Sequence, residues 1–214
     1  MLKLTNKYET DQELWDNFRS GNKSAFELIY KNNIDILSDY AIKIAGDKEL
    51  VNDAIQDLFV ELWKRRKQLA SVLSIKYYLL KSIRRDILRK KKQMKKRLAL
   101  INDSANYSLN FQTAIDVEVV IEEEKKERTV IVKNNLNQLS PKLKEIIYLK
   151  FYADLSNDEI ANILKINKQS VYNSVHRALN ILRDKITQIE YSATFSENSS
   201  GSSMSNSAPL SLIK

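Results

Sequence analysis

The sequence contains no cysteine, only two prolines and three glycines, and a single histidine in 214 residues. The lack of cysteine excludes disulfides and thiolate zinc sites, and it indicates a reducing compartment. Three scattered glycines cannot form a glycine-rich phosphate loop. One histidine, without a thiol or a converging acid pair, leaves little for catalysis. We therefore predict that the chain is not an enzyme and uses no cofactor or metal.

Long apolar runs are also missing. Residues 1–15 contain none, so we expect no signal peptide, and no stretch approaches the length of a membrane span. We expect a cytoplasmic protein without direct membrane insertion. The scarcity of glycine and proline, together with many Leu, Ile, Lys and Glu residues, predicts an all-α fold.

Positive charge is abundant but unevenly distributed. The chain has a net charge of +8, yet residues 81–97 alone hold ten Lys or Arg and one Asp, a net +9. Residues 116–127 hold six acids and two lysines, a net −4. A basic helix of this density in the first half predicts a surface that binds a polyanion.

Apolar periodicity divides the chain into two helical domains joined by a flexible linker. The first, residues 1–98, contains helices predicted at 11–20, from Ser24 as N-cap to 45, at 48–66 and from 75 onward. Residues 99–130 are weakly patterned and form the linker. The second domain covers 131–188 and begins its first clear helix at Ser140-Pro141. Eight of the sixteen residues in 192–207 are serine, so 189–214 is predicted to be a disordered tail.

Residues 156–186 have the pattern of a helix-turn-helix. Ser156 and Glu159 form a capping box, and Asn167 is a suitable N-cap for the second helix. That second helix carries an apolar stripe, and its opposite face carries hydrogen-bonding or cationic side chains suited to base edges in the major groove. A plain helical hairpin with a polar outer face fits the same spacing. The turn needs a residue with positive φ, and the sequence has Lys165 there instead of glycine.

Two further patterns lie in the first domain. Asp53, Asp57 and Glu61 repeat every four residues, which suits either a docking stripe for a basic partner or a solvated face. In the basic helix, arginines and lysines follow Tyr77 and Tyr78. Cations neutralise phosphates and aromatic rings stack on unpaired bases, so this helix suits melted DNA, although core packing explains the tyrosines equally well.

These features resemble a known family. DAIQDLFVELWKRR at 53–66, IKYYLLKSIRRDILRKKK at 75–92 and LSPKLKEIIYLKFYADLSNDEIANILKINKQSVYNSVHRAL at 139–179 resemble the extracytoplasmic-function (ECF) sigma factors of bacterial RNA polymerase, within the sigma-70 family. The resemblance covers about residues 10–187. It implies a region 2-like first domain and a region 4-like second domain.

The resemblance also implies roles for individual residues. The clamp helices of core RNA polymerase would be bound by Asp53, Gln56, Asp57 and Glu61. The minus-10 element would be held by Lys67, Gln68, Tyr78, Arg84, Arg85, Arg89 and Lys90. The minus-35 element would be read by Lys168, Gln169, Ser170, Tyr172, Asn173 and Arg177. The polymerase flap, promoter DNA and an anti-sigma factor, often membrane-bound in this family, are the other implied partners.

The chain departs from the family at two places. It has Tyr78-Leu79 where the family usually has Trp-Leu, and Arg84-Arg85 where an Arg-Asn pair is common. Two other functions remain open from the residues alone. One is a DNA-binding regulator with an N-terminal sensor or dimerisation domain, which does not explain the basic helix of the first domain. The other is a basic RNA-binding protein.

Overall fold

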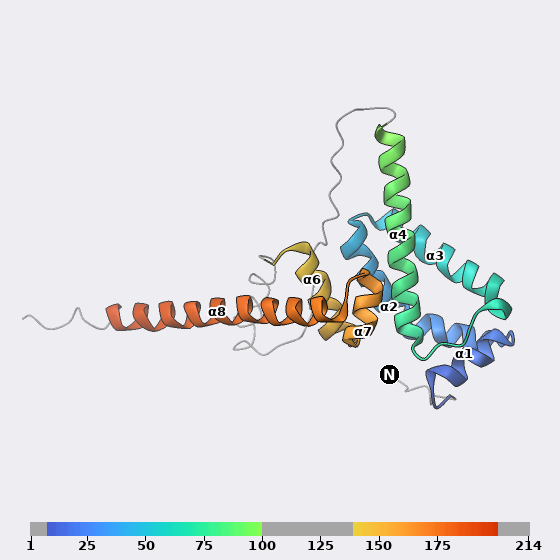
Figure 1. The fold of residues 1–214 in the computed structure, drawn as a ribbon, viewed down its shortest axis with the longest axis horizontal. Helices are drawn as coiled ribbons and strands as arrows, with labels where there is room; N and C mark the ends of the chain where they lie inside the picture. The colour runs from blue at the N-terminus through green and yellow to red at the C-terminus, as the bar shows by residue number, and fades with distance from the viewer. Residues whose placement is uncertain (1–7, 100–138, 201–214) are drawn as a thin grey trace, which may run out of the picture.

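The computed structural model describes the backbone of residues 8–99 and 139–200 and the side chains of residues 8–97 and 139–184. Within these residues all regular structure is helical, which confirms the predicted all-α class. Nearly all of the predicted linker, residues 99–130, lies outside the described residues. Figure 1 shows the two helical units, the second ending in a long helix that projects away from the first.

The first unit contains α1 (Asp11–Arg19), α2 (Lys23–Ala45), α3 (Lys48–Arg65), the short 3₁₀ helix η1 (Arg66–Gln68) and α4 (Ile75–Ala99). The predicted N-cap of α2 was wrong. Asn22 caps it, because its side chain accepts a hydrogen bond from the N–H of Ala25, and α2 begins before Ser24. Gly46 ends α2 at φ 68°, in the left-handed region where glycine avoids steric strain.

The second unit contains α6 (Pro141–Ile147), a π-helical turn η2 (Tyr148–Tyr152), α7 (Asn157–Leu164) and α8 (Lys168–Ser200). α6 begins at Pro141, directly after Ser140, as predicted. α8 differs from the prediction, because it continues through residues 189–200 of the expected disordered tail. A helix that is already nucleated gains one hydrogen bond for each residue added, so serine-rich sequence can extend it. Residues 201–214 lie outside the described residues.

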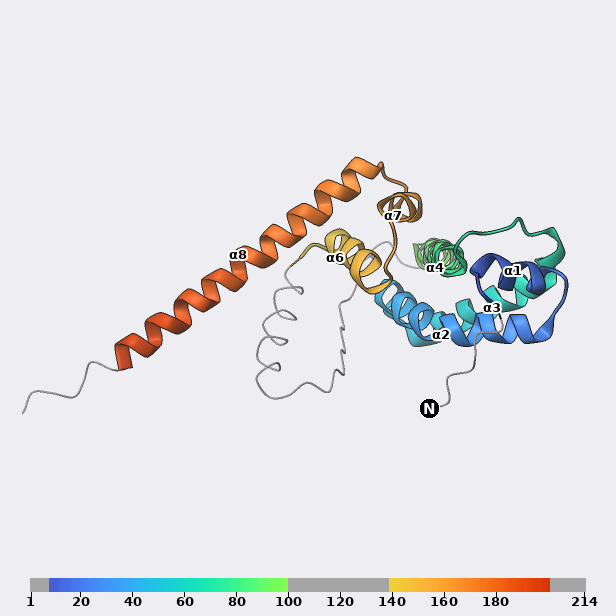
Figure 2. The same ribbon diagram turned by 90° about the horizontal axis from the view of Figure 1, so that it is seen from below.

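The apolar core is continuous between the two units. Aromatic and aliphatic side chains of α1 to α4, among them Trp15, Phe18 and Leu80, belong to the same buried cluster as Ile146, Leu149 and other residues of the second unit. Figures 1 and 2 show α4 beside α7, and Figure 2 shows the end of α2 approaching α6. The two predicted domains therefore pack against each other in this structure.

Candidate nucleic-acid interface

The turn between α7 and α8 is built as the sequence predicts. The Ser156 hydroxyl accepts from the N–H of Glu159, and the Glu159 carboxylate accepts from the N–H of Ser156. Lys165 lies in the left-handed region at φ 56° and ψ 47°. Its N–H and that of Ile166 both donate to the carbonyl of Ala161, which satisfies the end of α7. A residue other than glycine is strained in this conformation. The same turn sets the angle between α7 and α8.

α8 presents one polar face along its first turns. Val171 and Ala178 are buried beneath it. The six residues predicted to read the minus-35 element lie on the other side, five of them exposed and Ser170 half-buried: Lys168, Gln169, Ser170, Tyr172, Asn173 and Arg177. The Gln169 amide donates to the Asn173 side-chain oxygen over 3.0 Å, so these two side chains are already aligned. This face has the donors, acceptors and length that major-groove reading requires.

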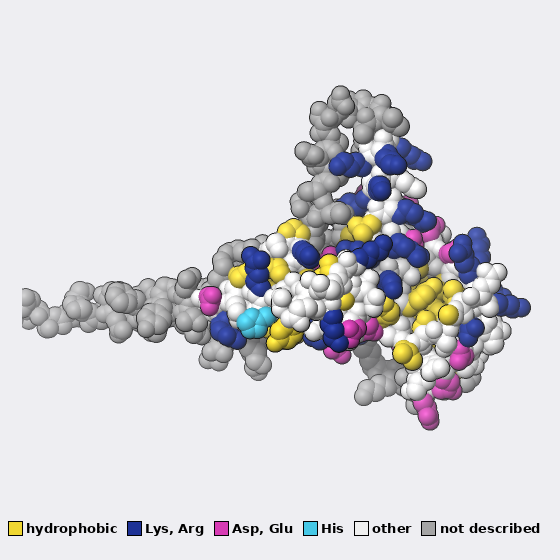
Figure 3. All heavy atoms as spheres, in the orientation of Figure 1, with side chains coloured by type: hydrophobic (Ala, Val, Ile, Leu, Met, Phe, Trp, Pro, Cys, Tyr) yellow, Lys and Arg dark blue, Asp and Glu magenta, His cyan; other side chains and the backbone are white. Residues whose placement is uncertain are grey.

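α4 is lined with cations along its length, as Figure 3 shows. Arg85 and Arg89 are exposed and lie near Asp86, at 3.9 and 3.3 Å. Lys90 is half-buried and donates to Asp57 of α3 over 2.7 Å. Tyr78 is half-buried and its ring packs edge-on against Trp15, with centroids 5.1 Å apart.

Arg84 does not lie with the exposed cations. Its guanidinium Nε donates to Glu145 Oε1 of α6 over 2.9 Å, so it joins the two helical units. The predicted minus-10 set is therefore divided. Arg85 and Arg89 are available on the surface, whereas Arg84 is already paired with a carboxylate.

A cleft of about 520 Å³ runs between α4 and α7 beside this pair. α4 contributes Tyr77, Tyr78, Arg85, Arg89 and Lys92, and α7 and its turn contribute Asn162 and Lys165. Its walls combine aromatic rings with cations.

Two hydrogen bonds from α1 anchor the loop between η1 and α4. The indole N–H of Trp15 donates to the carbonyl of Ala70 over 2.8 Å, and Asp11 Oδ2 accepts from the N–H of Ile75 over 2.8 Å. Lys67 and Gln68, predicted to face the minus-10 element, are exposed in η1, directly before this loop. Leu73 at its far side is 89% exposed. The loop is thus anchored at both ends with its tip free.

The acidic stripe of α3 is on the surface. Asp53, Gln56, Asp57 and Glu61 are all exposed, while Leu58 and Leu62 of the same helix are buried. Glu61 pairs with Arg65 one turn later, and Asp57 pairs with Lys90. All three carboxylates and the Gln56 amide of the stripe are exposed, although a partner has to compete with Arg65 and Lys90 for two of them.

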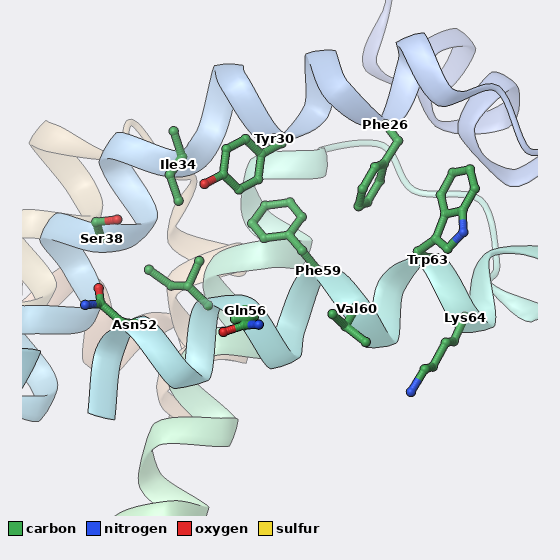
Figure 4. A pocket seen from close by; sticks show the side chains of 11 residues that line it. Phe26, Tyr30, Ile34, Ser38, Asn52, Gln56, Phe59, Val60, Trp63 and Lys64 are labelled. Atoms are coloured by element: carbon green, nitrogen blue, oxygen red, sulfur yellow. The ribbon is translucent and has the colours of Figure 1, made fainter. Parts of the chain in front are cut away.

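An apolar groove next to this stripe was missed by the sequence reasoning. It lies between α2 and α3, has a volume of about 680 Å³ and is drawn in Figure 4. Aromatic and aliphatic side chains form most of its lining: Phe26, Tyr30, Ile34, Ile55, Phe59, Val60 and Trp63. Tyr30 and Val60 are 41% and 45% exposed. The four-residue spacing of 26, 30 and 34 was the available signal, but core residues of a helix have the same spacing.

Comparison with known families identifies the family of the chain. Residues 29–97 match the family model of Sigma-70 region 2, and residues 130–182 match that of Sigma-70, region 4. The chain belongs to the sigma-70 family. The resemblance to ECF sigma factors found in the sequence is confirmed. A sigma factor is a non-catalytic initiation factor that directs promoter-specific transcription.

Solved structures of sigma factors share the fold. RpoE of Bartonella quintana, solved with the anti-sigma factor NepR, matches with a TM-score of 0.54 and 18% identity over 76% of this chain and 96% of RpoE. CnrH, solved with the cytosolic domain of CnrY, matches with a TM-score of 0.53 and 17% identity over 83% of this chain and 97% of CnrH. No curated protein sequence matches the chain.

Two negative observations apply to the part of the sigma factor that the structure describes. None of the helices there is both long and apolar enough to cross a membrane. No group of three or more His, Asp or Glu side chains there is placed to hold a metal ion.

Proposed function

We propose that this sigma factor is a subunit of RNA polymerase holoenzyme that reads the minus-35 element with α8, holds the minus-10 element with α4 and the 67–74 loop, and helps to open the DNA. The observation that carries the proposal is the presence of three separate surfaces on one chain. These are the polar face of α8, the basic side of α4 and the acidic stripe of α3 beside its groove.

The polar face of α8 supports minus-35 reading. Gln169, Asn173 and Arg177 lie on exposed turns of one helix, where bidentate contacts to adenine or guanine edges are available to such side chains. Lys168 is exposed at the first position of α8 and pairs with Asp158 over 2.7 Å, so a phosphate has to compete for it. Phosphate contacts fix the register, and the amide and guanidinium groups supply sequence preference.

The first unit supports minus-10 binding and melting. Arg85 and Arg89 neutralise phosphates of a separated strand, and Tyr78 at the cleft wall offers a ring edge to a base. The base-capturing loop of the family corresponds here to Lys67, Gln68 and the anchored loop that follows them. Each captured base offsets an unstacking cost of about a few kcal/mol, so melting draws its free energy from binding.

The α3 surface supports docking on polymerase. The exposed stripe attracts the cationic side of the clamp helices, and the adjacent groove accepts apolar side chains from a helix, as helix-in-groove complexes do. The second unit is assigned to the polymerase flap by family resemblance. An anti-sigma factor that covers the α3 groove would block polymerase binding, and the RpoE complex with the anti-sigma factor NepR favours such a partner here.

Transcription with purified components tests the proposal. Core polymerase and the full chain would be incubated with a library of upstream DNA fragments, and the 5′ ends of the transcripts would be sequenced. We expect start sites that appear only with the sigma factor and that share two spaced motifs. Core polymerase alone is the control. An absence of sigma-dependent start sites, together with no binding to core, would refute the proposal.

A further inference from the structure

Glu145 of α6 stands at the centre of the contact between the two helical units. Its Oε1 accepts from Arg84 Nε and from the Tyr40 hydroxyl, each over 2.9 Å, and its Oε2 lies 3.4 Å from Arg84 Nη2. Arg84 Nη1 also donates to the carbonyl of Ile163 in α7, over 3.3 Å. One arginine of the first unit is thus bound by two helices of the second. We call Arg84, Glu145 and Tyr40 the clasp.

The clasp is shielded from water. The side chains of Arg84 and Glu145 are 20% and 12% exposed, and Tyr40 is fully buried. The Tyr40 ring stacks on Tyr148 of η2, with centroids 5.6 Å apart. Burial opposes the charge on Arg84, but hydrogen bonds and attraction to Glu145 raise its pKa above the usual value. A partly buried pair with these additional hydrogen bonds is stronger than an exposed one.

The clasped arrangement cannot engage both promoter elements. Elements named for positions 25 base pairs apart lie about 85 Å apart along B-DNA, at about 3.4 Å per pair. Ile163 touches Arg84, and the ten residues from Ile163 to Asn173 span at most about 36 Å. The reading face of α8 therefore stays too close to α4. Promoter binding under the proposed function requires the two units to separate.

The sequence between the units is long enough for this separation. The 39 residues from 100 to 138 reach at most about 140 Å when fully extended. This length exceeds the distance between the two elements. The length of chain is then not what keeps the units together; the clasp and the shared apolar core hold them.

We propose that Glu145 is an internal competitor of DNA for Arg84, and that the clasp holds the free sigma factor in a closed state unable to bind a promoter. A carboxylate accepts two parallel hydrogen bonds from a guanidinium as a phosphate does. The strand phosphate replaces Glu145 on Arg84 when the units separate on polymerase. This inference rests on the proposed function, because it uses Arg84 as a strand contact.

Distance measurements on the full chain test the closed state. Since the sequence has no cysteine, dyes that react with thiols attach only at introduced cysteines. Asn32→Cys in α2 and Lys142→Cys in α6 provide two such sites, both at exposed positions. We expect high energy transfer in the free factor and low transfer in holoenzyme bound to promoter DNA. Glu145→Gln should lower the transfer of the free factor, and Tyr40→Phe, which keeps the stacked ring, should do so to a smaller extent. The exchanged pair Arg84→Glu with Glu145→Arg should restore it.

Binding of single-stranded DNA by the free factor tests the competition. Breaking a charged hydrogen-bonded pair raises the open fraction, so we expect Glu145→Gln to bind about tenfold more tightly than the wild type. The control is Glu49→Gln, an exposed acid of α3 outside the clasp and the docking stripe, which should bind as the wild type does. Circular dichroism would verify that each variant is folded.

The outcomes separate the two proposals. Unchanged energy transfer and DNA affinity in folded Glu145→Gln, with normal sigma-dependent transcription, would overturn the clasp and leave the proposed function intact. Absence of sigma-dependent transcription by the wild type would overturn the proposed function, and with it the competition for Arg84. Lower energy transfer and tighter DNA binding in Glu145→Gln, but not in Glu49→Gln, would support the clasp.

Discussion

The indole N–H of Trp15 donates to the backbone carbonyl of Ala70 over 2.8 Å, which joins α1 to the loop that precedes α4. Asp11 of the same helix accepts from the N–H of Ile75 at the other end of that loop. Trp15 is fully buried, so this contact fixes the loop against the core. α1 lies outside the matched region 2 segment and still shapes a surface assigned to the minus-10 element.

We predict that Asp11→Ala impairs promoter opening more than polymerase binding. The substitution frees the N–H of Ile75, and the loop loses one of its two anchors. Open-complex formation, followed by permanganate reactivity of unpaired thymines, should decrease several-fold. Glu13→Ala, an acid in the first turn of α1 without a contact to the loop, is the control. Equal losses in both variants would show that the anchor is unimportant.

Substitution in the α2–α3 groove should weaken binding to core polymerase. Val60→Glu places a charge at a surface that is 45% exposed, so folding tolerates it while a docked apolar side chain does not. We expect an affinity loss of tenfold or more, about 1.4 kcal/mol, as for a central interface residue. Leu73→Ala, at an exposed apolar residue of the loop before α4 and outside the groove, should leave core affinity unchanged. Wild-type affinity in Val60→Glu would exclude the groove as a docking surface.

Asn173→Ala should relax the DNA sequence preference of α8. Loss of a bidentate base contact costs about 1–3 kcal/mol of discrimination, so we expect a roughly tenfold smaller preference for matched over altered minus-35 sequence. Holoenzyme binding to both sequences would be compared by fluorescence anisotropy. Asn180→Ala tests the same residue type two turns further along the helix. A similar loss at Asn180 would place the reading face elsewhere.

Lys165→Gly should stabilise the protein. The left-handed conformation at φ 56° costs about 1–2 kcal/mol for a residue with a Cβ. Glycine removes this strain but gains entropy in the unfolded chain, so we expect a net gain of about 0.5–1 kcal/mol in the free energy of unfolding. Lys165→Ala keeps the Cβ and should change little. Chemical denaturation measures both, and a destabilised glycine variant would contradict the strain.

Two buried tyrosines should make stability fall at high pH. Burial, and then the negative charge of Glu145, raise the pKa of Tyr40; burial, and then a hydrogen bond and the charge of Asp39, raise the pKa of Tyr148. The unfolded chain loses these protons near pH 10, whereas the folded chain keeps them. The stabilisation is complete below about pH 10 and is lost as the pH rises further.

Denaturation at a series of pH values, with absorbance at 295 nm to follow tyrosinate, measures this effect. Lysines titrate in the same range, so the difference between wild type and a variant is the relevant quantity. Tyr40→Phe should show a smaller fall in the free energy of unfolding between pH 9 and 11 than the wild type. Parallel curves for the two proteins would rule out Tyr40 as a source.

Local patterns in the sequence predicted most of the second unit. The capping box at Ser156 and Glu159, the turn at Lys165 and the faces of α8 involve residues at most a few positions apart, so helix geometry alone relates them. The exposed stripe of α3 followed from the same periodicity. The end of α8 was not predicted, because serine-rich composition does not determine where a nucleated helix stops.

Long-range contacts account for what was missed. Arg84 was assigned to DNA, and nothing within α4 indicates that its partner is Glu145, 61 residues later. The α2–α3 groove was missed, because Phe26, Tyr30 and Ile34 of α2 have the spacing of core residues. Whether an apolar stripe is covered depends on which helix packs beside it.

The sequence by itself determined most of the helices, the capping box of α7 and the three charged or polar faces, because each depends on the 3.6-residue repeat and on neighbouring side chains. Only the tertiary structure decided which of these faces meet. It anchors the loop through Trp15, opens the groove beside the acidic stripe and places Glu145 on Arg84. The reason is that a buried ion pair or hydrogen bond needs atoms within about 3 Å, and packing alone brings such distant residues together.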